Sequence, residues 1–211
     1  MGLLPKDAHG NPVIPAGDNR YHAILGNAGP AYFVSPSTLA PVLIAYSAKV
    51  RLYSAKSSGS GVREIALERF FRIPQAEHER EHDLRPDEIV IEVVVPPASA
   101  GIKVASYEVR QKAAFDWPLA MASAALDLDG GAVKRARVVL GHVAPVPWIS
   151  PEAAVELTGK TITPEVAAAA ATAALAPAQP LSRNKYKITL AKAAVKRAIL
   201  QAAGTSTGGA A

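Results

Sequence analysis

Apolar and polar positions alternate most clearly within the stretch from Ile102 to Ile149. One alternating segment runs from about Val104 to Arg110, and another follows Val133. Between them lies an Ala-rich arm, about Leu119 to Leu128, with small side chains on both faces. Gly130-Gly131 joins this arm to the segment after it, and glycine can take the positive φ that a tight reversal needs. The pattern therefore predicts a three-stranded antiparallel sheet, built from a hairpin and one earlier strand.

Helical periodicity dominates the chain after this sheet. We expect a short helix from Pro151 to Leu157, an Ala-rich helix that Thr163-Pro164-Glu165 caps and that ends near Leu175, and a last helix from Asn184 to about Ala203. Apolar residues gather on one side of the last helix, at Ile188, Ala191, Val195, Ala198 and Ala202. Gly204 ends it, and residues 205–211 are expected to be a disordered tail. An antiparallel sheet covered by helices makes the predicted fold class α+β.

The first half of the chain gives shorter signals. Met1 to Gly17 is rich in Pro and Gly and is expected to be an extended leader. A helix from Thr38 to about Ser47 is predicted, with Ser35 as its cap and Pro36 at its first position. Its expected buried face consists of Leu39, Val42, Leu43 and Tyr46. Strands are predicted at Ala31–Val34, Lys49–Tyr53, Arg63–Leu67 and Ile89–Val95, with one helical turn at Glu68–Phe71.

Pro96-Pro97 ends the last of these strands and predicts a domain boundary. We therefore expect one domain over residues 1–97 and a second over residues 98–204. The 211 residues are enough for one domain or two small ones.

Composition excludes several classes of protein. The sequence has no cysteine, so it supplies neither disulfides nor cysteine ligands for metals. The net charge of +5 is modest and its Lys and Arg residues are spread out, which favours solvated faces over a nucleic-acid-binding surface. No apolar run reaches the roughly 18 residues of a membrane span, and the start does not resemble a secretory signal. We therefore expect a soluble, cytoplasmic chain.

Catalytic motifs are missing from the sequence. It contains no phosphate-binding P-loop, no G-x-G-x-x-G and no G-x-S-x-G. His and Glu alternate between Gln75 and Asp83, but not at a zinc-helix spacing, so we interpret this segment as an exposed charged loop and predict no metal site. Asp127 and Asp129 flank the hairpin turn and are interpreted as turn residues. From the residues alone, this is a two-part α+β protein of unknown function.

Six blocks of sequence resemble the FAD-binding medium subunit of the molybdenum hydroxylases, the family of xanthine dehydrogenase, aerobic carbon monoxide dehydrogenase and related aldehyde oxidoreductases. They occur in the family's order and span nearly everything from Asn19 to Ala203. The blocks are NRYHAI from Asn19, SPSTLAP from Ser35 with the strand at Lys49-Val50, LRPDEIV from Leu84, YEVRQKAAFD from Tyr107, GHVAPVPW from Gly141 and PLSRNKYK from Pro180.

The resemblance implies a partial second FAD-binding lobe followed by the family's C-terminal domain, a three-stranded antiparallel sheet covered by helices. The family's first lobe, with its Gly-rich loops around the FAD pyrophosphate, has no counterpart here, because Gly26-Asn27-Ala28-Gly29 is poor in glycine and misplaced. We therefore expect the C-terminal portion of such a subunit, either from a truncated gene or from a split one.

The resemblance also implies FAD contacts, residue by residue. Ser37 and Thr38 stand where the family has a Ser-Asp-Leu that contacts FAD, although Thr38 lacks the carboxylate. Ile89 and Val90 match a strand near the isoalloxazine ring. Glu108 stands where relatives often have lysine, and its carboxylate would disfavour the anionic form of reduced flavin. Structural alternatives remain open: a helix cap for Ser37 and Thr38, strand packing for Ile89 and Val90, and a solvent-facing side chain for Glu108.

The implied function is electron transfer through FAD within an oxidoreductase complex. The molybdopterin and the iron–sulfur clusters would belong to a large and a small partner subunit, and FAD would need the missing lobe for tight binding. The resemblance does not name the substrate. The alternative is a non-catalytic fragment that packs on partner subunits and binds no flavin by itself.

Overall fold

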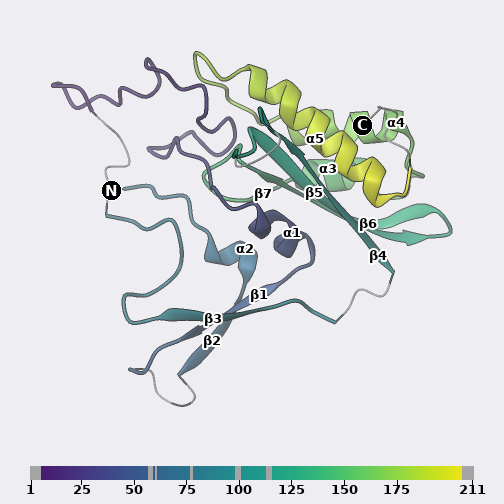
Figure 1. Cartoon of the computed structure of the whole chain (residues 1–211), viewed down its shortest axis with the longest axis horizontal. Coiled ribbons are helices and arrows are strands. Elements are labelled where there is room, and N and C mark those ends of the chain that lie inside the picture. The colour runs from purple at the N-terminus through teal and green to yellow at the C-terminus, as the bar shows by residue number, and fades with distance from the viewer. Residues whose placement is uncertain are drawn as a thin grey trace.

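A four-stranded antiparallel sheet forms the middle layer of the molecule (Figure 1). The structure is a computed structural model that describes residues 6–56, 59, 61–76, 78–97, 101–112 and 116–205. The strands follow the order β4-β5-β6-β7, with β4 at Ile102–Val109, β5 at Ala120–Asp129, β6 at Ala132–Gly141 and β7 at Trp148–Ile149. The antiparallel sheet is thus confirmed. The prediction of three strands lacked β7, whose two residues are too short for a periodic signal.

The predicted hairpin joins β5 to β6. Gly130 and Gly131 have φ of 58° and 86°, the left-handed region that a two-residue turn of this kind requires at both positions. Asp129 pairs with Ala132 across the turn, and the register shifts by one residue between Asp127 and Leu128.

Three helices cover one face of this sheet. They are α3 (Pro151–Leu157), α4 (Pro164–Ala174) and α5 (Tyr186–Ala202), close to the predicted positions. Ser150 Oγ accepts a hydrogen bond from the Ala153 amide, and Thr163 Oγ1 accepts one from Val166, so both shorter helices have side-chain caps. The α5 helix packs on β4 and β5, and α3 packs on β6.

The opposite face of the sheet is also covered. Helix α1 (Leu39–Ala45) packs on β4, β5 and β6 from the side away from α5. Consequently Ala120 to Leu126 is buried without a break, and Ala125 and Val139 belong to the apolar cluster around α1. This explains why the arm preceding the hairpin carries small side chains on both faces.

A second, smaller sheet lies beyond α1. Its order is β2-β1-β3, with β1 at Lys49–Tyr53, β2 at Val62–Ala66 and β3 at Ile89–Val94, and the short helix α2 (Leu67–Phe70) follows β2. Strand β1 alternates as predicted, with Val50 and Leu52 buried beneath it. Strand β3 lies at an edge, and its large apolar side chains remain exposed, from 41% at Val93 to 60% at Ile89.

Three local predictions in the first half are wrong. Helix α1 begins at Leu39, and the hydroxyl that accepts a hydrogen bond from its first turn, from the Ala40 amide, is that of Ser37 and not that of Ser35. Ser35 is held elsewhere, because its own amide donates to the Ala144 carbonyl. Leu39 is 62% exposed, while Ala40, Pro41, Ile44 and Ala45 form the buried face. Residues 31–34 form no strand, although the Tyr32 carbonyl accepts from Ala23.

The segment after the leader packs against the C-terminal half. Ile24 and Leu25 are fully buried in the core formed with α3, α4 and α5, and both amides donate to the Val143 carbonyl. Asn19 is fully buried, and its side chain bonds to Ser182 and to the Arg183 amide. The boundary near residue 97 stays a prediction, and residues 98–100 and 206–211, including most of the expected tail, lie outside the described residues.

Candidate functional site

A cavity of about 200 Å³ lies where the N-terminal segment, the connection from β4 to β5 and the start of α5 meet. We call it the Trp117 cavity and define it by Tyr21, Gln111, Asp116, Trp117, His142 and Lys187, with Val34, Pro118 and Leu119 completing its walls. Its first and last residues, Tyr21 and Lys187, are 166 residues apart in the sequence, so the fold creates this site.

Two aromatic side chains give the cavity an exposed apolar rim. Trp117 is 68% exposed and Tyr21 is 52% exposed. Aromatic residues this exposed contribute little to a core, but they offer flat faces on which a planar ligand can stack. Pro118 is buried behind Trp117 and fixes the backbone next to it.

His142 is a strained and unsatisfied residue in the cavity wall. Its φ is 61°, in the left-handed region that costs a residue with a β-carbon roughly 1–2 kcal/mol. The side chain is 1% exposed, and Nε2 has no hydrogen-bond partner. Burial, reinforced by the charge of Lys187, lowers the pKa of His142 to about 4, so the imidazole is neutral at pH 7. Unpaired buried nitrogens are rare and point to a function or a ligand.

Lys187 supplies a buried positive charge beside this histidine. It is 1% exposed, and its Nζ donates to the carbonyl oxygens of Tyr21 at 3.1 Å, His22 at 3.2 Å and His142 at 2.7 Å. Burial lowers the pKa of Lys187 to about 8, which still leaves it protonated at pH 7. All three ammonium hydrogens therefore have acceptors, and the charge is held in one place.

Glu108 lies near the cavity as part of an ion pair. Its carboxylate pairs with Arg110, two residues along β4, and the side chain is 26% exposed. Its charge acts on His142, raising the pKa of that residue while Arg110 lowers it. The structure thus places Glu108 beside the cavity, with its charge largely balanced by Arg110.

The other four residues that the resemblance predicts as FAD contacts do not line the cavity. Ser37 Oγ accepts from the Ala40 amide at 3.0 Å, and Thr38 makes no capping bond at the start of α1. Ile89 and Val90 are 60% and 46% exposed on β3. Their role in binding a cofactor stays a prediction.

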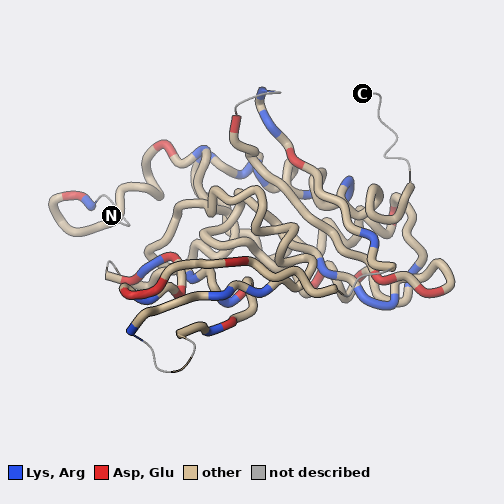
Figure 2. Tube along the Cα trace, turned by 60° about the horizontal axis from the view of Figure 1, so that its bottom comes forward, with Lys and Arg blue, Asp and Glu red and all other residues tan. Residues whose placement is uncertain are grey.

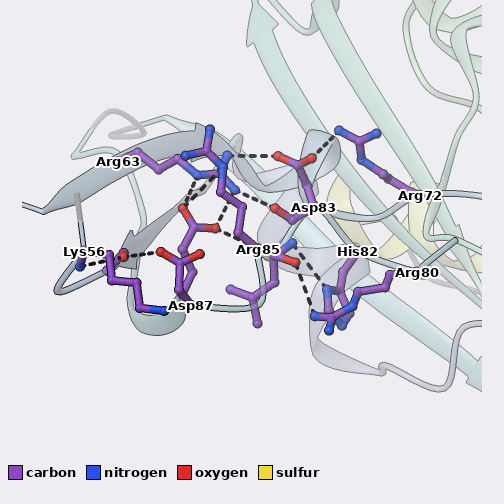
Figure 3. A network of polar contacts seen from close by, with 11 residues as sticks. Lys56, Arg63, Arg72, Arg80, His82, Asp83, Arg85 and Asp87 are labelled. Carbon is purple, nitrogen blue, oxygen red and sulfur yellow. Dashed lines mark hydrogen bonds and ion pairs between the residues drawn. The ribbon is translucent and has the colours of Figure 1, made fainter. Parts of the chain in front are cut away.

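The charged loop predicted between Gln75 and Asp83 is organised by ion pairs (Figure 3). Arg63 binds Glu88 in a two-pronged contact at 2.6 and 2.8 Å and also contacts Asp83. The bonds from Arg63 lower the pKa of Glu88 to about 2 and raise that of Arg63. His82 stacks on Phe70 instead of turning to a ligand. Within the described ranges, no group of three or more His, Asp or Glu could hold a metal ion.

The glycines near residue 26 are used for packing. A β-carbon on Gly26 would lie 2.8 Å from Trp148, and one on Gly29 would lie 3.1 Å from Gln75. Side chains therefore occupy the space on which a phosphate-binding loop would depend.

Sequence reasoning missed Trp117, His142 and Lys187 as site residues. For Lys187 a signal was present, because it lies four residues before Ala191 on the apolar side of α5, an unusual place for a lysine. Nothing in the local sequence around Trp117 or His142 indicates burial or exposure.

Residues 105–202 match the family model of the CO dehydrogenase flavoprotein C-terminal domain. The matched residues include most of β4, then β5 through α5, and with them Trp117, His142 and Lys187.

Curated relatives extend the likeness beyond this domain. The aldehyde oxidoreductase FAD-binding subunit PaoB of Escherichia coli is 28% identical over 186 residues, which are 88% of this chain and 54% of that protein. The carbon monoxide dehydrogenase medium chain of Hydrogenophaga pseudoflava is 33% identical over 120 residues, 55% of this chain and 42% of that protein. The resemblance inferred from the six sequence blocks is thereby confirmed. The chain spans about half the length of these curated relatives.

Solved structures agree on the fold. A chain of the carbon monoxide dehydrogenase of Hydrogenophaga pseudoflava matches 96% of this chain and 64% of its own length, with a TM-score of 0.66 and 27% identity. A chain of quinoline 2-oxidoreductase from Pseudomonas putida 86 matches with the same TM-score, 0.66, at 23% identity, over 96% of this chain and 65% of its own. The CO dehydrogenase flavoprotein C-terminal domain and the segment before it therefore share one architecture with these chains.

Charge and apolar length give two further limits. Lys and Arg are interspersed with Asp and Glu along the trace (Figure 2). Among the described residues, no helix is both long and apolar enough to cross a membrane.

Proposed function

We propose that this chain is the FAD-binding, electron-transferring part of a molybdenum hydroxylase complex of the xanthine, aldehyde or CO dehydrogenase type. The observation that carries the proposal is the Trp117 cavity within a CO dehydrogenase flavoprotein C-terminal domain. Bound FAD would supply two-electron chemistry coupled to one-electron transfer, while the protein positions the ring and adjusts its electronic properties.

The walls of the cavity fit the flat end of this cofactor. Trp117 and Tyr21 offer aromatic faces for stacking, and the neutral His142 offers an unpaired ring nitrogen. The buried Lys187 adds positive charge. A planar, partly polar ring that gains negative charge on reduction suits this combination.

The segment around Gly26 and Gly29 does not offer a binding site for the phosphate end of the cofactor. Gly26 and Gly29 pack against Trp148 and Gln75, so this segment does not cradle phosphate. We therefore expect the 211 residues alone to bind FAD weakly, with most of the affinity supplied by polypeptide outside them.

Each residue implied by the resemblance has a proposed role on this basis. The hydroxyls of Ser37 and Thr38 would contact the cofactor from the start of α1, and Ile89 and Val90 would give aliphatic contact from β3, in both cases outside the Trp117 cavity. Glu108 would modify the charge around the flavin, an effect that its ion pair with Arg110 weakens.

The proposed partners are a large molybdopterin-binding subunit and a small iron–sulfur subunit. The name of one relative, a medium chain, and that of another, an FAD-binding subunit, support membership of a multi-subunit oxidoreductase. Substrate oxidation would take place in the large subunit, and electrons would pass through the clusters to FAD and on to an acceptor.

Titration with FAD tests the proposal. The sequence has two tryptophans, so Trp148→Phe leaves Trp117 as the single fluorescent reporter. FAD should quench this fluorescence at concentrations above about 1 μM. Trp117→Ala removes the reporter, so its binding is followed by flavin fluorescence instead, and it should be weaker by roughly tenfold, about 1.4 kcal/mol, as expected for a lost stacking contact. Tyr53→Ala removes an exposed aromatic side chain at the end of β1 in the other sheet; it is the matched control and should leave binding unchanged.

Two outcomes would contradict parts of this picture. Submicromolar binding by the chain alone would mean that a phosphate site exists within these residues. No quenching at any FAD concentration, either alone or with co-purified partners, would favour the flavin-free interaction fragment instead.

A further inference from the structure

The Trp117 cavity contains a charge that no sequence block assigns to the flavin. It is the ammonium of Lys187, from the first turn of α5. Its place in the cavity wall puts a positive charge next to any ring that binds there.

The geometry of Lys187 holds its charge in one place. Three backbone carbonyls, from two segments that are distant in sequence, accept its hydrogen bonds at 2.7–3.2 Å. With every donor in use, the ammonium cannot swing out to solvent or to a ligand. It acts through its electric field, and fields are screened least where water is excluded.

The surrounding charges leave this field largely uncancelled. Asp18 pairs with Arg20, and Glu108 pairs with Arg110, so each of these pairs is close to neutral. His142 is neutral at pH 7, and Asp116 is the remaining carboxylate in the wall, partly exposed to water. The titratable groups that contact Lys187 or share its cavity wall are Tyr21, His22, Asp116 and His142.

We infer that Lys187 is a positioning residue that raises the reduction potential of a flavin bound in the Trp117 cavity. The inference rests on the proposed function. Reduction of the ring takes up two electrons and one proton and leaves one net negative charge, which a fixed ammonium nearby stabilises. Because His142 holds Lys187 through its own carbonyl, its strained backbone helps to aim the charge.

The test is redox potentiometry of FAD bound to the full chain, purified with its partner subunits. Lys187→Met should lower the midpoint potential by at least about 30 mV, which for a two-electron couple corresponds to a tenfold change in the equilibrium constant for reduction. Lys187→Arg keeps the charge and should stay near the wild-type value. Lys185→Met, which removes an exposed lysine two residues away, is the matched control and should not change the potential.

The pH profile gives a readout that survives if Lys187→Met fails to fold. Lys187 loses its proton near pH 8, whereas arginine stays charged throughout the accessible range. The potentials of wild type and Lys187→Arg should therefore coincide at pH 7 and diverge above about pH 8, with the wild type lower.

The outcomes separate this inference from the proposed function. If the wild-type chain binds FAD but the potential-against-pH profiles of wild type and Lys187→Arg stay parallel from pH 7 to pH 10, the role of Lys187 is overturned and the proposed function stands. Failure of the wild-type preparation to bind FAD would overturn both.

Discussion

Replacing Lys187 by methionine should destabilise the fold, for reasons that do not depend on any ligand. Methionine fills a similar volume but donates no hydrogen bond. The carbonyls of Tyr21 and His142 would lose the donor Lys187, while His22 keeps a second donor in Asn184. Each buried acceptor left unpaired costs about 1–3 kcal/mol. Because the variant no longer has to bury an ammonium, part of this cost is offset, and we expect a net loss of about 2–4 kcal/mol at pH 7.

Urea unfolding followed by circular dichroism measures this loss, with Lys185→Met as the control for removing a positive charge from the start of α5. The pH dependence gives a second check. The pKa of Lys187 is lowered from 10.5 to about 8 in the folded chain, so between these values the unfolded chain binds more protons and the stability from this group rises with pH. The difference between wild type and Lys187→Met should therefore widen above pH 8. Equal unfolding free energies for Lys187→Met and Lys185→Met would refute the reasoning.

Three further predictions concern the rest of the fold. Glu88→Gln should lower the free energy of unfolding by about 1–2 kcal/mol at neutral pH. Folding lowers the pKa of Glu88 from 4.5 to about 2, so the stability that its carboxylate contributes is present above pH 4.5 and is lost as the pH falls through 2. Acid titration of the stability of both proteins would show this loss. Gly26→Ala should destabilise by about 1–3 kcal/mol more than Gly130→Ala, because both glycines have φ near 60° but only Gly26 faces Trp148, and thermal unfolding that ranks them equally would contradict this. Ile89→Lys, on the exposed edge strand β3, should change the free energy of unfolding by less than about 0.5 kcal/mol. It should also reduce self-association measured by light scattering, because exposed apolar edges promote pairing between chains. Unchanged scattering would argue against β3 as the surface through which chains associate.

Local signals in the sequence predicted the regular elements well. Gly130-Gly131 specifies its turn because both residues must have positive φ, whatever the surrounding fold. Thr163 followed by Pro164 marks the start of α4 for an equally local reason, a hydroxyl that accepts from the first free amides. The Ala-rich arm of β5 was predicted as a strand, whereas its burial on both faces depends on α1, which the sequence did not place on the sheet.

Prediction failed where distant segments decide the outcome. Ser35, Ser37 and Thr38 all offer a hydroxyl to a helix start, and the choice among them follows from the bond between Ser35 and Ala144. Leu39 fits an amphipathic pattern, yet the turn that begins α1 leaves it in solvent. Neither contact can be deduced from spacing along the chain.

The candidate site was partly predictable from the family and partly not. Glu108 was singled out by its place in a sequence block; it is not among the residues that line the cavity, and its role stays a prediction. Its partner Arg110, which balances its charge, changes the expected effect on a flavin. Lys187 was out of reach, because two of its acceptors lie 165 and 166 residues away.

The same distances connect the stability of the chain with the chemistry proposed for it. Lys187 fastens the N-terminal segment to the residue after β6, and both belong to the wall of the Trp117 cavity. Loosening that segment would move Tyr21 and free the ammonium, so the cavity would lose an aromatic face and its fixed charge together. A substitution at a distant contact of the segment, such as Asn19→Ala, which removes the bond to Ser182, should therefore weaken flavin binding as well as stability. The contrary result is that Asn19→Ala lowers the free energy of unfolding and leaves the FAD affinity and reduction potential unchanged. In that case the N-terminal segment would contribute to stability only, and α5 and the β4–β5 connection alone would hold the cavity.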